Sequence, residues 1–113
     1  MNTKKAPKDL HSIMSNFDLD GLVNDSNRNK NEFKVAAAQF VKTELSLSLT
    51  FVEAARFYTS NGKPKRAREN RDHAQKALAQ AQKFFPMADF TKDENRAYKE
   101  KILQLQLLLR AQQ

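Results

Sequence analysis

The chain contains no cysteine and no tryptophan, and it has only two glycines and three prolines. Without cysteine it can form no disulfide, no thiolate metal site and no cysteine nucleophile. A domain without disulfides fits a reducing compartment, so we expect a cytoplasmic protein. Two glycines cannot build the glycine-rich loops that cradle phosphates in nucleotide-binding enzymes.

Long apolar runs are also missing. No stretch of about 18 apolar residues occurs, and a membrane-spanning helix is therefore not expected. The N-terminus carries Lys4, Lys5 and Lys8, but the apolar segment that a secretory signal requires does not follow them. We therefore predict neither a membrane protein nor a secreted one.

The residues that are plentiful are those that favour helices. At 113 residues the chain has the length of one domain. Ala, Lys, Gln, Leu, Arg and Glu dominate, and these residues lose little free energy on entering a helix. The composition predicts an all-α protein. A mean hydropathy of −0.76 indicates that part of the chain is tail or solvated helix surface.

We expect three main helices, at about residues 32–60, 65–85 and 91–112. No glycine or proline interrupts the first segment, which is either one long helix or two with a joint near Lys42. Residues 45–50 alternate between apolar and polar as a strand does, but the helical spacing on both sides favours a helix. Gly62 and Pro64 mark the first break, and Pro86 ends the second helix. Thr91 and Glu94 have the spacing of a capping box for the third.

The N-terminal part has a different composition. Residues 1–31 are predicted to be mostly a disordered basic and polar tail, and residues 32–113 a helical domain. Within the tail, the spacing of apolar residues predicts a short amphipathic helix at residues 9–17, formed by Leu10, Ile13, Met14 and Phe17.

One spacing pattern resembles a known repeat. Ala74, Leu78, Ala81 and Pro86 place small, large and small residues on one helix face before a proline. This series resembles the second helix of a tetratricopeptide unit. The resemblance covers about residues 45–86, and Phe51 and Tyr58 of the preceding helix would pack against the small residues. The Leu-Gly pair of that family is not matched, because Gly62 falls in the break.

The resemblance implies a helical hairpin, capped by the last helix, with a docking surface for a peptide or protein. A generic antiparallel three-helix bundle with a small-residue packing face is the alternative that the residues leave open.

We find no catalytic or metal-binding constellation. His11 and His73 lie in separate segments without a second ligand at a useful spacing. The carboxylates are scattered over several helices, and no pair can be assigned acid and base roles. Ser46, Ser48 and Thr50 have no candidate base nearby. We therefore predict a protein that is not an enzyme and that has no cofactor or metal.

The strongest charge cluster lies between residues 63 and 71. It contains Lys63, Lys65, Arg66, Arg68 and Arg71, opposed only by Glu69, which leaves a local net charge of +4. Cations at the start of a helix oppose its dipole, so another reason for their position is expected. One hypothesis is a contact site for nucleic acid phosphates or another polyanion, in keeping with the net charge of +7. The alternative is a solvated surface that keeps the protein soluble.

The last helix carries more leucines than one buried stripe needs. The stripe itself is formed by Tyr98, Ile102, Leu105 and Leu109, whereas Leu107 is expected to point away from it. A second apolar face indicates either deep burial or self-association, and of the two we favour a homodimer contact through this helix. The overall prediction is a small interaction domain that binds a protein, a peptide or itself, with polyanion binding as the alternative.

Overall fold

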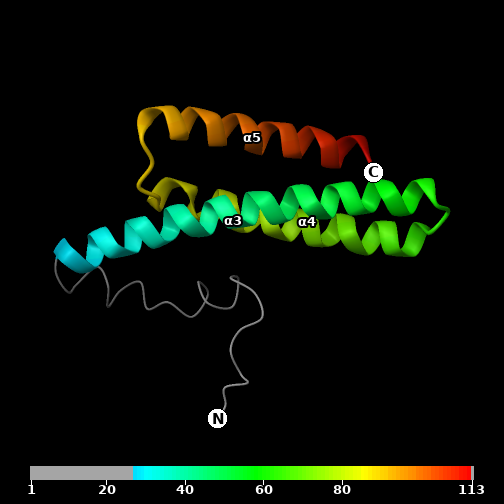
Figure 1. Cartoon of the computed structure of the whole chain (residues 1–113), viewed down its shortest axis with the longest axis horizontal. Helices are drawn as coiled ribbons and strands as arrows, with labels where there is room; N and C mark the ends of the chain where they lie inside the picture. The colour runs from blue at the N-terminus through cyan, green and yellow to red at the C-terminus, as the bar shows by residue number, and fades with distance from the viewer. Residues whose placement is uncertain (1–26, 113) are drawn as a thin grey trace, which may run out of the picture.

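The structure is a computed structural model that describes residues 27–112. This part of the chain forms three α-helices, α3 (Asn27–Ser60), α4 (Pro64–Phe84) and α5 (Lys92–Ala111), with a short 3₁₀ turn, η2 (Phe85–Met87), after α4 (Figure 1). The all-α prediction is confirmed. The predicted tail up to residue 26, with the helix expected at residues 9–17, lies outside the described residues.

Helix α3 is one continuous helix of 34 residues, which decides between the two alternatives for this segment. The alternating residues 45–50 are helical, as the flanking spacing indicated. The helix begins at Asn27, earlier than residue 32, so residues 27–31 belong to it and not to the tail. Polar residues such as Asn and Ser favour turns in isolation, but they are also tolerated at the start of a helix.

Helices α3 and α4 form an antiparallel hairpin. Gly62 adopts a left-handed conformation, with φ of 70°, just past the end of α3. The backbone N–H of Lys63 donates to the carbonyl of Tyr58 at 2.8 Å, and that of Gly62 donates to Thr59 at 3.2 Å. This pair of bonds is a Schellman motif, which satisfies carbonyls that the helix end would otherwise leave open.

Small side chains line the contact between the two helices. Alanines are buried on both sides of it, namely Ala37 and Ala55 on α3 and Ala67, Ala74, Ala77 and Ala81 on α4. Because these side chains are short, the two backbones can approach closely along the length of the hairpin. The hairpin is accordingly the most extensive helix contact among the described residues.

Helix α5 lies along one side of the hairpin and runs in the same direction as α3 (Figure 1). Near its start, the ammonium group of Lys42 lies 3.6 Å from a carboxylate oxygen of Glu94. At its end, the side-chain amide of Gln112 donates to the backbone carbonyl of Val52 at 3.5 Å. The helix is thus attached to α3 at both ends.

Aromatic rings fill the space where the start of α5 meets the hairpin. Phe40 and Phe84 pack edge to face with ring centroids 5.2 Å apart. Phe90 stacks in a tilted arrangement against Tyr98, with a centroid distance of 5.0 Å. These contacts join the α4–α5 connection to the core. Among residues 27–112, no helix combines the length and apolar character needed to cross a bilayer.

Candidate functional site

The apolar series on α4 lies inside the molecule. Ala74 and Ala81 are completely buried, and Leu78 is nearly so. All three belong to the hydrophobic core, which also contains buried residues of α3 and α5. A partner therefore cannot touch these side chains directly, and their role in the structure is to let the helices pack.

Pro86 does not take part in this packing. It lies in η2, where its side chain is exposed. Helix α4 ends at Phe84, because a proline ring excludes the preceding residues from continuing a regular helix. Pro86 thus lies outside the packed face of α4, at the end of the helix, where the sequence predicts a stop.

Phe51 and Tyr58 lie on a half-buried side of α3. The Phe51 ring is 5.1 Å from the exposed imidazole of His73 on α4, measured between centroids. The guanidinium of Arg66 lies over the Tyr58 ring, 5.7 Å from its centroid. Both aromatic side chains thus contact α4, but at the edge of the helix interface and not at its centre.

Helix α3 has two buried polar residues, of which Glu44 was not expected in the interior, while for Ser48 both the helix surface and a packing position were open. Ser48 and Glu44 are both completely buried. The Ser48 hydroxyl donates to the carbonyl of Ala74 across the hairpin, at 2.9 Å. A signal was present in the sequence, because Val41, Glu44, Ser48 and Val52 have helical spacings of three, four and four on one face.

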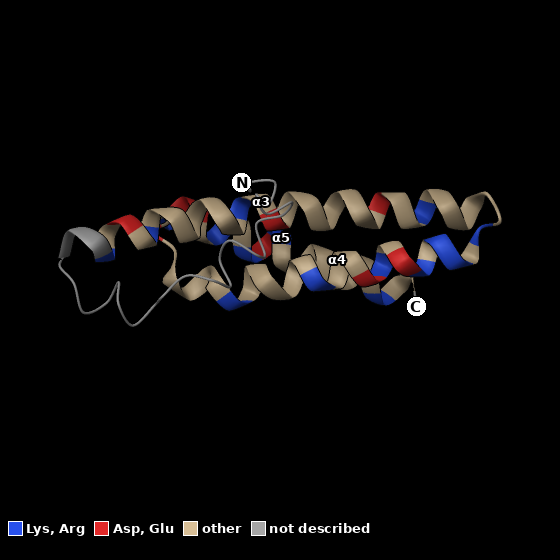
Figure 2. Cartoon of the chain, turned by 90° about the horizontal axis from the view of Figure 1, so that it is seen from below, with Lys and Arg blue, Asp and Glu red and all other residues tan. Residues whose placement is uncertain are grey.

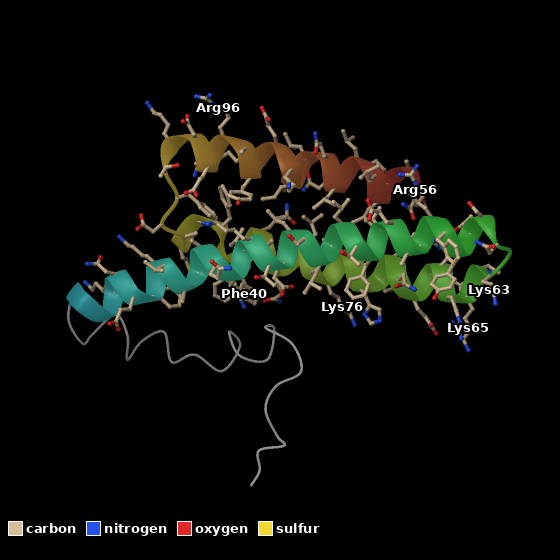
Figure 3. The ribbon with its side chains drawn as sticks, viewed as in Figure 1. Phe40, Arg56, Lys63, Lys65, Lys76 and Arg96 are labelled. Carbon is tan, nitrogen blue, oxygen red and sulfur yellow. The ribbon has the colours of Figure 1, made fainter. Side chains whose placement is uncertain are left out.

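The basic residues at the start of α4 form a cluster that we call the basic turn: Lys63, Lys65, Arg66, Arg68 and Arg71. Arg71 is half-buried and the others are exposed. In Figure 2 the ribbon at the hairpin turn and in the first part of α4 is largely blue, the colour of Lys and Arg. In Figure 3, Lys63 and Lys65 project from this end of the molecule.

The start of α4 does not compensate the positive charge of this cluster. The first turn of α4 contains no acidic residue, and its N-cap, Lys63, makes no capping side-chain hydrogen bond. The positive end of the helix dipole is therefore not compensated by its own side chains. Arg68 and Arg71 line a shallow hollow beside the α5 terminus, together with Thr59, Pro64, Ala67 and Gln112.

The outer side of α5 carries exposed apolar side chains. Leu103 and Leu107 are 59% and 60% exposed, although both occupy the middle of a helix whose other face is buried. None of the other described helices lies over this side of α5 (Figure 1). Arg96, near the start of the same helix, points away from the hairpin (Figure 3). We call this surface, from Arg96 to Arg110, the outer face of α5.

Helix α5 is held in place at its start by the capping box. The hydroxyl of Thr91 accepts from the Glu94 N–H at 3.1 Å, and the Glu94 carboxylate accepts from the Thr91 N–H at 3.0 Å. The hydrogen bond from the Thr91 backbone, aided by Lys42 and by the Thr91 hydroxyl, lowers the pKa of Glu94, and partial desolvation opposes the shift. The predicted capping box is thus confirmed.

Residues 27–112 contain no group of three or more His, Cys, Asp or Glu side chains placed to hold a metal ion. No protein-family model, curated protein or solved structure is significantly similar to this chain. Two surfaces of the described chain remain as candidates for binding, the outer face of α5 and the basic turn.

Proposed function

We propose that this chain is a non-enzymatic interaction domain that associates with another protein chain. In this proposal the tetratricopeptide-like hairpin is the scaffold, and it presents α5 to the partner. The observation that carries the proposal is the exposure of Leu103 and Leu107 in the middle of an otherwise amphipathic helix.

Physical chemistry supports this interpretation. Two leucines one helical turn apart form a continuous apolar strip, because residues at positions i and i+4 are neighbours on a helix surface. Burying about half of each side chain on a partner removes apolar area from water at roughly 25 cal/mol per Å². The helix that presents them is attached to the hairpin at both ends, so little conformational entropy is lost on binding.

The proposal can be tested by site-specific photocrosslinking in cells that produce the full chain. A photoreactive amino acid replaces Leu107, and a matched control carries it at Lys76, an exposed position on α4. Figure 3 shows Lys76 on the side of the hairpin away from α5. We expect polypeptide adducts from position 107 and few from position 76. Equal yields at both positions, or no polypeptide adduct at 107, would contradict the proposal.

A second candidate function is the binding of nucleic acid or another polyanion by the basic turn. The observation that favours it is the uncompensated start of α4, where exposed cations and the helix dipole add their positive fields. Arg66 already lies against Tyr58. A variant that keeps this contact and removes the other four cations, Lys63, Lys65, Arg68 and Arg71, therefore lowers the charge without disturbing the Arg66–Tyr58 packing.

Fluorescence anisotropy with labelled duplex DNA and single-stranded RNA tests this second function. The titration is made at two salt concentrations with the native chain and with a variant in which Lys63, Lys65, Arg68 and Arg71 are replaced by Ser. Polyanion binding predicts an affinity that falls steeply with salt and is lost in the variant. If no binding is detected at low salt, the basic turn is not a polyanion site, and its positive charge serves only to keep the protein soluble.

A further inference from the structure

The outer face of α5 has the spacing of a coiled-coil seam. Arg96, Glu100, Leu103, Leu107 and Arg110 follow one another at intervals of four, three, four and three residues. All five are exposed, and they lie on the side of α5 opposite the buried residues Ile102, Leu105 and Leu109. This is the spacing of the a and d positions of a heptad, with the two leucines as its apolar centre and charged residues on either side.

The order of residues in this seam is self-complementary when the two helices run in opposite directions. In an antiparallel pair, an a position of one helix faces a d position of the other. If the two-fold axis passes beside Leu105, Leu103 faces Leu107 of the second copy. Glu100 then faces Arg110, and the same contacts recur on the other side of the axis, as closed two-fold symmetry requires.

A parallel pair of the same helices has no such complementarity. It would place Glu100 opposite Glu100 and Arg110 opposite Arg110, so that like charges meet in the same layers. Like charges across an interface are costly and exclude wrong arrangements. Within the described chain neither Glu100 nor Arg110 forms an ion pair, so both are free to pair with a second copy.

We propose that the partner of the outer face of α5 is a second copy of this chain, bound through an antiparallel, two-fold symmetric pairing of α5 helices. The two leucine layers supply the apolar contact, and the Glu100–Arg110 layers at each end select the direction and register. This inference rests on the proposed function and specifies its partner. Because the contact is one helix wide, it belongs with the small, transient interfaces.

The proposal can be tested by charge reversal and complementation in the full chain, with the molecular mass followed by sedimentation velocity. Glu100→Arg creates two Arg–Arg layers in the dimer, and Arg110→Glu creates two Glu–Glu layers. We expect each variant alone to dimerise at least about tenfold more weakly than the native chain. Mixed in equal amounts, the two variants form a heterodimer in which both end layers are again Glu opposite Arg, and dimerisation returns.

Matched controls separate this effect from a change in net charge. Glu69→Arg and Lys76→Glu make the same changes in charge at exposed positions on α4, and both should dimerise as the native chain does. Circular dichroism of each variant checks that its helices are intact.

The possible outcomes distinguish a wrong partner from a wrong function. A native chain that stays monomeric, or a mixture of the two variants that does not recover, would overturn the self-pairing. If the mixture fails while photocrosslinking at position 107 still yields adducts with a different polypeptide, the proposed function stands and only its partner is wrong. If position 107 gives no polypeptide adduct, the proposed function fails as well.

Discussion

Two buried polar side chains of α3, one with a hydroxyl and one with a carboxyl group, lie in the interior of the hairpin. Ser48 lies between two helices and donates to the Ala74 carbonyl, while Glu44 lies one turn before it on the same buried face. In the sequence, Glu44 is one of several scattered carboxylates, and Ser48 fits either the helix surface or a packing position for a small side chain. Helical periodicity, applied without regard to polarity, would have placed them in the interior.

At this scale we predict that Ser48→Ala destabilises the protein by about 1 kcal/mol relative to Ser46→Ala. The first change removes a buried hydrogen bond between helices. The second removes an exposed hydroxyl from the same helix and corrects for the higher helix propensity of alanine. Urea denaturation measures both free energies of unfolding. Equal values would show that the Ser48 bond adds nothing to stability.

A second prediction concerns the charge of Glu94. Its pKa is lower in the folded chain than in the unfolded one, chiefly because its carboxylate accepts the Thr91 N–H. The resulting stabilisation is therefore present above the unfolded-state pKa of about 4.3 and is lost as the pH falls through the lower folded-state value. Glu94→Gln keeps an acceptor but no charge.

We expect the native chain to be more stable than the Glu94→Gln variant at pH 7, and the difference to shrink as the pH falls from about 5 toward 3. Thermal unfolding followed by circular dichroism across this range measures it. A difference that stays constant with pH would contradict the role assigned to the Glu94 charge.

At the scale of helices, sequence reasoning succeeded where the chain itself carries a stop or start signal. Gly62 ends α3, Pro86 prevents α4 from continuing, and Thr91 with Glu94 begins α5. The predicted start of α3, at about residue 32, was wrong, because Asn27 and the polar residues after it have the composition of a turn. Local propensity is weak there, and the helix that follows decides the conformation.

The contact between α3 and α4 leads to a third prediction. Ala81 is fully buried between the helices, so Ala81→Phe should overpack the hairpin and lower the free energy of unfolding by about 1–3 kcal/mol. Ala79 is exposed on the same helix, and Ala79→Phe should change stability by less than about 0.5 kcal/mol. Equal effects in chemical denaturation would remove Ala81 from the packed interface.

At the scale of the whole molecule, the helices are arranged as a hairpin with α5 on one side, and this arrangement leaves an exposed face on α5. The sequence predicted a surplus of leucines on this helix, and Leu107 is indeed exposed. The sequence did not predict that Leu103 is exposed beside Leu107. Which residues of a helix face the solvent is known only once the buried face of that helix is known. The side on which α5 packs, and hence the seam from Arg96 to Arg110, required the structure.

The most direct test of the central claim is the mass of the full chain by sedimentation velocity over about 1–200 µM, a range suited to a small, transient interface. The account predicts that the native chain passes from monomer to dimer as its concentration rises, and that the double variant Leu103→Ser, Leu107→Ser stays monomeric. The control variant Phe57→Ser alters an exposed apolar side chain on α3 and should dimerise as the native chain does. A native chain that remains monomeric throughout, or a double variant that dimerises equally well, would contradict it.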